Sequence, residues 1–419
     1  MRMAMIAIFW TAAALLLYTY AGYPLWIFLR ALARPRPWRR APVFPTVSVI
    51  LVVHNGAGVL QAKIDHLLTL DYPPERLELI AVSDGSTDAT AQILRRNRLV
   101  HSIIFPKRVG KCAALNAGMR RASGEILVFE DIRPAHDSAA LRSLVSNFAD
   151  PQVGCAAGEV VLHEDGHEPS ARAVGRLYWR YEQWIRRNES LLDSVTGVYG
   201  GFYAVRRKLA ARLPDSAVLD DVLQPLAVIR QGYRAVVDVH ARVQDVWPRR
   251  LRAEFQRKAR TLAGNFQLLQ LVPWSLTSEN RLRFAFVSHK LLRLLGPALL
   301  VILAGASAEL AARSRGYAAL AAAQLLFYLA ALCGARLRLP GITRLAAAAR
   351  AFCMMNLAVV AGFYKFLATR GPLWSIWNPT PPLAPSSARR PNPNAPPAKV
   401  PESIFMGTSA VQPADEGAN

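Results

Sequence analysis

The chain begins with a long uncharged segment, and this segment restricts the folds that are open to it. Residues 3–29 contain no charged side chain, and a helix needs about 20 apolar residues to span a bilayer. Tyr20, Tyr23 and Trp26 gather toward its end, as in the aromatic belt of a membrane interface, and arginines crowd residues 30–40. The run is too long for a signal-peptide core. We therefore expect a retained membrane anchor, with a cytoplasmic region after it.

Three further apolar segments lie in the C-terminal third of the chain, roughly at 284–308, 317–335 and 351–368. Each is near spanning length, so the region 284–370 is expected to hold about three membrane spans. Residues 378–419 are rich in proline, which predicts a disordered tail. This pattern indicates a multi-pass protein of the cell membrane, inner or plasma, with its largest globular part in the cytoplasm.

Composition narrows the class of partners. The formal net charge is +22 over 419 residues, which favours anionic partners. The mean hydropathy is positive, and most basic clusters lie beside the expected spans, so membrane lipids explain the charge better than nucleic acid does. The four cysteines form no C-x-x-C pair, which favours reduced thiols over a disulfide framework.

Between the apolar ends lies a globular region, residues 42–280. Short apolar runs alternate there with amphipathic stretches, the pattern of βαβ units in an α/β domain with a mostly parallel sheet. Four strands are expected at 46–53, 77–82, 102–105 and 125–129.

Polar side chains follow each expected strand. They are His54 and Asn55, Ser83 to Ser86, Lys107 with Arg108 and Lys111, and Glu130 with Asp131. Ligands of open α/β sheets bind at the carboxyl ends of the strands, so these cations and carboxylates should meet at one edge. The chain has neither a P-loop nor a G-x-G-x-x-G fingerprint. This edge of the sheet therefore suits a nucleotide with its phosphates and a metal ion, bound without either of these two motifs.

Two carboxylates at that edge are candidate ligand-binding groups. Asp84 can accept hydrogen bonds from a base or a ribose, whereas Ser86, Thr87 and Asp88 beside it are expected to cap the next helix. Asp131 should emerge at the same edge. Mg²⁺ and Mn²⁺ are often bound by one or two carboxylates plus substrate phosphates, although an acid at a strand end can also be a turn residue.

Six segments in this order resemble the family 2 glycosyltransferases: "TVSVILVVHN", "YPPERLELIAVSDGSTDAT", "RVGKCAALNAGM", "GEILVFEDIRP", "GVYGGFYAVRR" and "VLDDVLQPLAVIRQGYR". That family includes cellulose and hyaluronan synthases and many bacterial exopolysaccharide enzymes. The resemblance covers about residues 45–270. It implies an α/β domain of the GT-A fold, Rossmann-like with a mostly parallel sheet, which lies in the cytoplasm and is flanked by transmembrane helices.

The resemblance also implies an activity and its residues. The donor would be a nucleotide-sugar, usually a UDP-sugar, and transfer would invert the anomeric centre by direct displacement. The residues carried over are the backbone around Val53 and His54 with Asp84 for uridine, Lys111 near the diphosphate, Asp131 for Mn²⁺ or Mg²⁺, and Asp221 as general base. The neighbouring Asp220 is expected only to favour the start of a helix. An inverting transfer needs such a base on the acceptor hydroxyl.

The sequence departs from the family pattern at three places. Arg133 stands where the second acid of D-x-D is common, and we expect it to contact phosphate and weaken the need for metal. Residues 257–261 replace the Q-x-x-R-W motif of processive enzymes; Arg260 keeps a cation for the diphosphate, but no tryptophan is present to stack acceptor sugar. Gly56 replaces a common glutamate, for which the sequence offers no account.

These features predict a membrane-anchored inverting glycosyltransferase that extends a polysaccharide or a lipid-linked glycan. Its partners would be a nucleotide-sugar, that acceptor and membrane lipids. We also allow for partner proteins of polysaccharide export, and we expect no nucleic-acid partner. Two alternatives stay open: transfer of a single sugar to a lipid acceptor, and a non-catalytic nucleotide-binding membrane subunit.

One amphipathic stretch, residues 172–192, has two interpretations. It places Leu177, Tyr181, Trp184 and Ile185 on one helical face with arginines around them. Such a helix can lie on a membrane surface. It can equally be an ordinary helix that packs its apolar face against a core.

Overall fold

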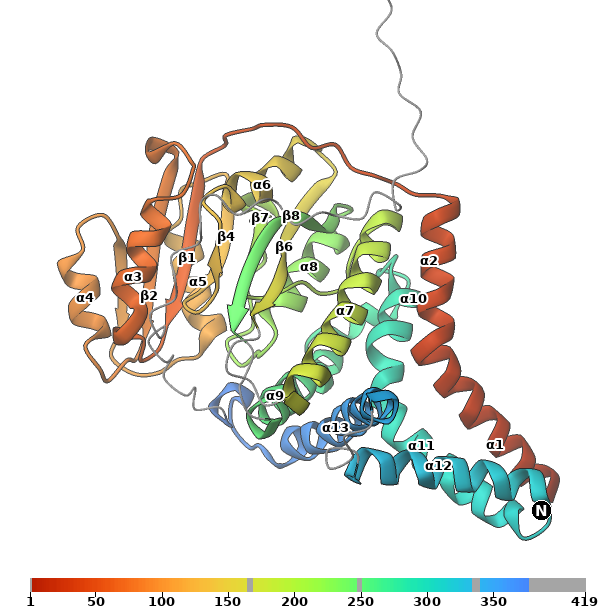
Figure 1. The fold of residues 1–419 in the computed structure, drawn as a ribbon. Helices are drawn as coiled ribbons and strands as arrows, with labels where there is room; N and C mark the ends of the chain where they lie inside the picture. Colours follow the sequence, from red (N-terminus) through yellow and green to blue (C-terminus); the bar gives the residue numbers. More distant parts are fainter. Residues whose placement is uncertain (1, 164–168, 247–250, 334–339, 377–419) are drawn as a thin grey trace, which may run out of the picture. The chain divides into compact units, whose positions relative to one another are not determined.

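The computed structural model describes residues 2–163, 169–246, 251–333 and 340–376. The predicted disordered tail, 378–419, lies outside this part of the chain. Within it, the strands form one sheet in the order β3-β2-β1-β4-β7-β6-β8-β5 (Figure 1). The pairs β1·β2, β1·β4, β2·β3 and β6·β8 are parallel, whereas β7 runs antiparallel to both of its neighbours.

The first four strands lie where the sequence predicts them, within two residues at each end. They are β1 (Val47–Val53), β2 (Leu77–Asp84), β3 (His101–Phe105) and β4 (Ile126–Asp131). The other strands are β5 (Ala135–His136), β6 (Val153–His163), β7 (Phe202–Arg206) and β8 (Arg234–Val246). Because β1, β2 and β4 are parallel neighbours, their polar carboxyl ends share one edge of the sheet.

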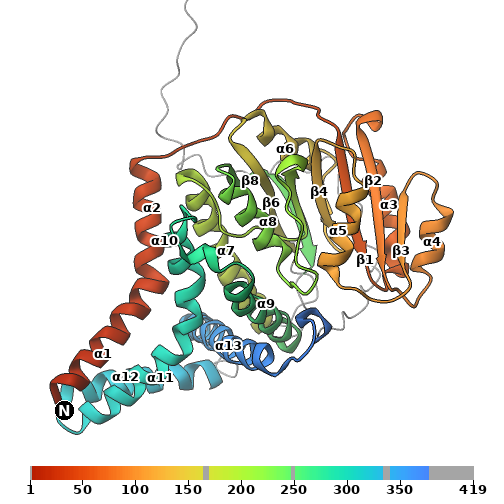
Figure 2. The same ribbon diagram turned by 180° about the vertical axis from the view of Figure 1, so that it is seen from behind.

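Successive side chains of each strand point to opposite faces of the sheet, so two hydrophobic cores form, one on each face. Ile50 of β1 packs with α5 (Lys111–Arg121), whereas its neighbours Val49 and Leu51 pack with α3 (Ala57–Leu68) on the other face (Figures 1 and 2). A strand buried on both faces needs apolar residues at nearly every position, as in "VSVILVV".

The remaining helices of the globular region connect the strands and cover the sheet. They are α4 (Thr90–Arg96), α6 (Ala140–Ser146), α7 (Pro169–Leu192), α8 (Asp220–Arg230) and α9 (Leu251–Leu271). Of these, α8 begins with two acids, which its helix dipole favours.

Four helices in the described residues are long and apolar enough to cross a membrane, by length and composition alone. They cover Arg2–Ala33, Arg283–Ala311, Arg315–Leu332 and Leu345–Ala368, close to the four segments predicted from the sequence. The first comprises α1 (Arg2–Leu17), a π-helical turn and α2 (Tyr23–Ala33). The others comprise α10 (Arg283–Phe286), a second π-helical turn, α11 (Leu292–Ala311), α12 (Arg315–Cys333) and α13 (Pro340–Ala368).

Helix α7 packs against two of these apolar helices through a buried polar network. His289, 3% exposed, lies between Glu189 (Nδ1 to Oε1, 2.7 Å) and Glu182 (Nε2 to Oε2, 3.3 Å). Tyr23 of α2 donates its hydroxyl to Glu189 at 2.7 Å, and Arg293 of α11 pairs with Glu182. The polar contacts of α7 therefore join the globular region to the first two apolar helices.

This arrangement decides between the two interpretations of the amphipathic stretch. Ile185 is fully buried and packs with Tyr23, Ile27 and Ala285, while Tyr181 donates its hydroxyl to a carbonyl of the first apolar helix. The apolar face of α7 therefore packs against a core, and the apolar helices form that core.

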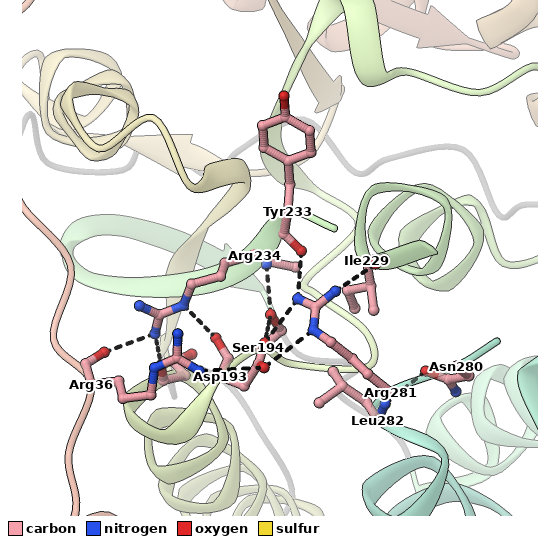
Figure 3. Close-up of polar contacts among 11 residues, drawn as sticks. Arg36, Asp193, Ser194, Ile229, Tyr233, Arg234, Asn280, Arg281 and Leu282 are labelled. Carbon is pink, nitrogen blue, oxygen red and sulfur yellow. Dashed lines mark hydrogen bonds and ion pairs between the residues drawn. The ribbon is translucent and has the colours of Figure 1, made fainter. Parts of the chain in front are cut away.

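A second network joins the segments that enter and leave the globular region (Figure 3). Asp193, just after α7, accepts from Arg281 at 2.9 Å and 3.2 Å, and Arg281 also donates to the carbonyls of Ile229 and Tyr233. Arg234 donates to the carbonyls of Asp193 and Arg36 at 2.8 Å each, Arg36 lying in the linker after α2. Two arginines therefore satisfy backbone carbonyls that would otherwise be left unpaired at this junction.

Candidate active site

Two loops at the carboxyl ends of β1 and β2 interlock. Asn55 adopts a positive φ of 52° and accepts hydrogen bonds from Thr87, while its own N–H donates to Ser86. Asp88 accepts from the N–H groups of Thr90, at the start of α4, and Ala57, at the start of α3. The expectation that all three residues cap the next helix is thus correct for Asp88, whereas Ser86 and Thr87 bind the neighbouring loop.

Asp84 lies at this edge of the sheet, as predicted, and its carboxylate stabilises a neighbouring loop. Its carboxylate is 3% exposed and accepts from the backbone N–H groups of Val109 (2.6 Å) and Gly110 (3.1 Å). His54 donates from Nδ1 to the carbonyl of Asp84 at 2.7 Å, which fixes its tautomer. Val53 is buried, so only its backbone is suited to meet a ligand. Asp84 therefore shapes the loop that leads into α5, and a nucleotide contact by these three residues stays a prediction.

Lys111, the first residue of α5, is at the centre of the site. Its Nζ lies 3.0 Å from Asp131 and 3.2 Å from Asp220, and it donates to the carbonyl of Gly200 at 3.3 Å. Burial opposes its charge, but the two carboxylates raise its pKa above the ordinary value, so it is a permanent cation. The structure thus brings together three groups that the sequence spreads over more than a hundred positions.

Asp131 presents an ionised carboxylate at the end of β4. Its side chain is 30% exposed. Burial opposes ionisation, yet the charges of Lys111, Arg133 and Arg260 lower its pKa below the ordinary value. It is therefore able to ligate a metal ion or to order the cations around a diphosphate.

The acids at the start of α8 have different environments. Asp220 is 3% exposed and accepts the hydroxyl of Tyr203 at 2.9 Å besides its pairing with Lys111. It does more than favour a helix start, which sequence reasoning missed. Asp221 is half-buried, and burial together with the charge of Asp220 raises its pKa to about 6, against the opposing charges of Lys111 and Lys290. A carboxylate poised there is a suitable general base near neutral pH.

The glycine loop between α7 and β7 lies close to Asp221. A Cβ on Gly200 would lie 3.0 Å from the Cβ of Asp221 and 3.2 Å from its Oδ2. The N–H of Val198 donates to the Asp221 carbonyl at 2.9 Å, and the Gly201 carbonyl accepts from the N–H of Asp131 at 3.1 Å. The close approach of backbone to Asp221 accounts for glycine at position 200.

Arg133 is paired within the protein. Its guanidinium lies 3.7 Å from Asp245, which also accepts the hydroxyl of Tyr199 at 2.7 Å, and the Asp245 carboxylate raises the pKa of Arg133 further. The side chain is 43% exposed, so it remains accessible to a phosphate.

Helix α9 adds cations from a part of the chain whose motif departs from the family pattern. Arg260 lies close enough to Asp131 and Asp221 for their charges to oppose the lowering of its pKa by burial. Lys258 stands 3.8 Å over the ring of Tyr178, next to Trp179, and burial lowers its pKa to about 7. Cations already lie over both rings, since Arg186 also stands 5.8 Å from the ring of Trp179.

A segment from the far end of the chain reaches the site. Leu373 is 4% exposed and packs in the core that Ile50 shares with α5. Trp374 donates from Nε1 to the carbonyl of Asp215 at 3.1 Å. The Trp374 ring lies under Gly110, where any Cβ would meet it at 2.5 Å, and the Arg108 guanidinium is 5.3 Å from the ring. Sequence reasoning missed this contact, because nothing local marks Trp374 as a neighbour of the loop that Asp84 orders.

The open α/β sheet, its charged edge and the paired acids of α8 together define a glycosyltransferase domain of the GT-A fold. Residues 48–213 match the model of the family described as Glycosyl transferase family 2, so this region of the chain is similar to that family.

Known proteins with similar sequences include two bacterial ones. One is "Probable glycosyltransferase YdaM" of Bacillus subtilis, 24% identical over 234 residues. The other is "Poly-beta-1,6-N-acetyl-D-glucosamine synthase" of Staphylococcus aureus, 22% identical over 234 residues. In both cases the match covers 53% of this chain and 55% of the relative, so the chain spans about half the length of the curated relatives it matches.

A solved structure shares the arrangement over more of the chain. It is the mannosyltransferase PcManGT from Pyrobaculum calidifontis, in complex with GDP-Man and Mn²⁺. The TM-score is 0.66 at 25% sequence identity, and the likeness covers 88% of this chain and all of the other.

Proposed function

We propose that the protein is an inverting glycosyltransferase that acts at a membrane and transfers a sugar from a nucleoside diphosphate donor to a glycan or lipid-linked acceptor. The observation that carries this proposal is the position of Lys111 between Asp131 and Asp220, with Asp221 next in sequence. A permanent cation then faces the leaving diphosphate, and a carboxylate of raised pKa stands beside it.

The bond changes follow from these positions. The acceptor hydroxyl oxygen forms a bond with the anomeric carbon of the donor sugar, while the bond from that carbon to the β-phosphate oxygen breaks. Asp221 takes the hydroxyl proton, and the nucleoside diphosphate leaves with the electron pair. Lys111, with Arg133 and Arg260 as further candidates, stabilises the charge that develops on the diphosphate.

A divalent cation, Mn²⁺ or Mg²⁺, fits the site only together with substrate. The described residues include no group of three His, Cys, Asp or Glu side chains placed to ligate a metal. Asp131 offers one partly exposed carboxylate, and a magnesium-type site commonly completes its ligands with phosphates and water. Asp131 would hold the ion, which would supply charge for the departing diphosphate. The Mn²⁺ bound in the structure of the similar mannosyltransferase supports this assignment.

This proposal leaves the base of the donor nucleotide to be determined by experiment. The sequence resemblance favours a UDP-sugar, whereas the similar mannosyltransferase binds GDP-Man. The first experiment is therefore nucleotide release by the purified full-length protein against a panel of UDP-sugars and GDP-sugars with Mn²⁺. We expect sugar-selective release that is lost in Asp221→Asn, with nucleotide binding retained in that variant. Binding without release in the wild type as well would favour the non-catalytic subunit.

Transfer of one sugar and polymerisation remain rival outcomes of the same chemistry. The synthase among the relatives supports a polysaccharide product, and the lack of a tryptophan after Arg260 supports a short one. Product length on a gel separates them, since a ladder indicates polymerisation and a single new band indicates one transfer.

A further inference from the structure

A buried lysine lies behind the short segment 131–133, which supplies two charged side chains to the candidate active site. Lys63 of α3 is 6% exposed, and its Nζ donates to the Oε1 of Glu130 and to the carbonyl of Pro134, at 2.5 Å each. These two acceptors stand immediately before and immediately after the segment. One ammonium group therefore joins both ends of the stretch that carries the proposed metal-binding carboxylate.

The side chains of Glu130 and Asp131 point to opposite faces of the sheet, because they are successive residues of β4. Asp131 meets Lys111 of α5 on one face, with 3.0 Å between Oδ1 and Nζ. Glu130, whose side chain is fully buried, meets Lys63 of α3 on the other face. The contacts that hold Glu130 in place therefore also determine where the carboxylate of Asp131 lies.

A histidine also approaches Glu130. The Nε2 of His136 lies 3.4 Å from the Oε1 of Glu130, and the Nδ1 of the same ring lies 3.3 Å from the Nε2 of His66. Both ring nitrogens of His136 therefore face other side chains, and the bond to the carbonyl of Pro134 is made by Lys63.

Stability alone does not explain an ion pair at this depth. Moving an ammonium group and a carboxylate out of water costs free energy, and well-packed apolar side chains of similar volume are often as stable or more so. Two apolar side chains would fill the space of Lys63 and Glu130, but they would not bond the carbonyl of Pro134. The pair thus supplies a directional contact that packing does not.

Resting on the proposed transfer reaction, we infer that Lys63 is a positioning residue, which holds segment 131–133 in the conformation in which Asp131 binds the metal ion of the donor diphosphate. It does so by joining Glu130 to Pro134. Lys63 itself is buried against the opposite face of the sheet, so it acts through the backbone of the segment and contacts neither metal nor sugar.

Two variants of the buried pair separate positioning from stability. Lys63→Met removes both bonds and leaves the Glu130 carboxylate buried without its ammonium partner, so the thermal midpoint should fall. Combining Lys63→Met with Glu130→Met removes both charges and should restore most of the midpoint, yet neither methionine can bond Pro134. If the single variant does not fold, the double variant decides. Ile64→Val is the matched control, since Ile64 is fully buried beside Lys63 in α3 and loses one methyl group with no change of charge.

The measurement is the affinity of the full-length protein for Mn²⁺ at saturating UDP and, separately, GDP, with free Mn²⁺ followed by electron paramagnetic resonance. We expect the Mn²⁺ dissociation constant to rise about tenfold in both variants of the pair, as for the loss of one hydrogen bond to a charged group. Ile64→Val should bind Mn²⁺ as the wild type does. Calorimetric titration with the same nucleotides in a chelator should change far less, because Lys111 contributes to that binding from α5.

Three results would overturn the inference. Unchanged Mn²⁺ affinity in the double variant would reduce the pair to packing, and an equal loss of nucleotide affinity in the chelator would indicate a general distortion of the site. Absence of nucleotide-dependent Mn²⁺ binding in the wild type would remove the metal from Asp131. Each of these results leaves the glycosyltransferase proposal intact, because nucleotide release tests it separately. Absence of release with every donor would instead reject the proposed function itself.

Discussion

Ile132 occupies the space that a side chain at position 56 would need. A Cβ on Gly56 would lie 2.5 Å from the Cδ1 of Ile132 and 2.6 Å from the Cγ1 of Val53. Gly56 replaces a glutamate common in the family, and Ile132 stands between Asp131 and Arg133 in the altered D-x-D segment. The side chains of Ile132 and Val53 fill this space, which accounts for the glycine that the sequence alone leaves unexplained.

The first prediction concerns this packing. Gly56→Ala should destabilise the protein by about 1 to 3 kcal/mol through overpacking, and Ile132→Val by about 0.5 to 1.5 kcal/mol through loss of a methyl group. The double variant should lose less than the sum, because the shortened side chain makes room for the new methyl. Thermal unfolding of the four proteins measures the coupling. Strict additivity would show that the two positions do not share this space.

The second prediction concerns pH. Burial and Asp220 raise the pKa of Asp221 to about 6. The base works only when ionised, so kcat/KM should rise with pH through about 6 and fall about tenfold per unit below it. Removing an opposing cation should raise this midpoint, because Lys111 and Lys290 both favour the ionised form. A pH profile of Lys290→Gln beside the wild type checks the direction, and an unchanged midpoint would contradict the electrostatic account.

The third prediction concerns Lys111. Lys111→Gln leaves Asp131 and Asp220 without the cation between them and removes a positive charge from the diphosphate position. We expect nucleotide affinity and turnover to fall, each by about tenfold or more. Arg120→Gln is the control, since Arg120 is an exposed cation at the other end of α5. Calorimetric titration with UDP and GDP gives the affinity, and equal binding by both variants would remove Lys111 from the donor site.

The fourth prediction concerns metal. Because the protein supplies one suitable carboxylate, Mn²⁺ should bind weakly to the protein alone and tightly only with the nucleoside diphosphate present. Spectroscopic titration of free Mn²⁺, with and without nucleotide, measures this difference directly. Asp131→Asn should abolish the nucleotide-dependent part. Tight binding without nucleotide would require ligands beyond Asp131, and full activity after chelation would assign the metal's task to Arg133.

The fifth prediction concerns Trp374. Its ring packs on Gly110, one of the two N–H donors that Asp84 fixes. Trp374→Ala should free this loop, so that the amides of Val109 and Gly110 exchange hydrogen faster and the donor KM rises. Ser375→Ala, an exposed neighbour, should change neither. Hydrogen exchange with mass detection reports the loop, and unchanged protection would mean that Asp84 alone orders it.

Much of the fold follows from patterns within short segments. Strands such as Val47–Val53 are recognisable because parallel strands are buried on both faces and so are apolar throughout. The positions of Asp131 and Lys111 at this edge are predictable because the carboxyl ends of parallel strands meet there. The sequence could not show that Asp220 pairs with Lys111, or that Lys290 and Trp374 reach the site. Those contacts depend on how distant helices pack, and no local periodicity records them.

The ion pairs between α7 and the apolar helices determine which fragments of the enzyme can be expressed and purified. Glu182 and Glu189 are nearly inaccessible, and their partners Tyr23, His289 and Arg293 all come from outside the sheet domain. A fragment trimmed to the sheet domain would expose an apolar face of α7, leave Glu189 without His289 and leave Glu182 with Arg186 as its one cation among these partners. Expression of such a fragment should yield aggregates, and a usable preparation has to retain the helices at both ends, extracted together in one detergent micelle.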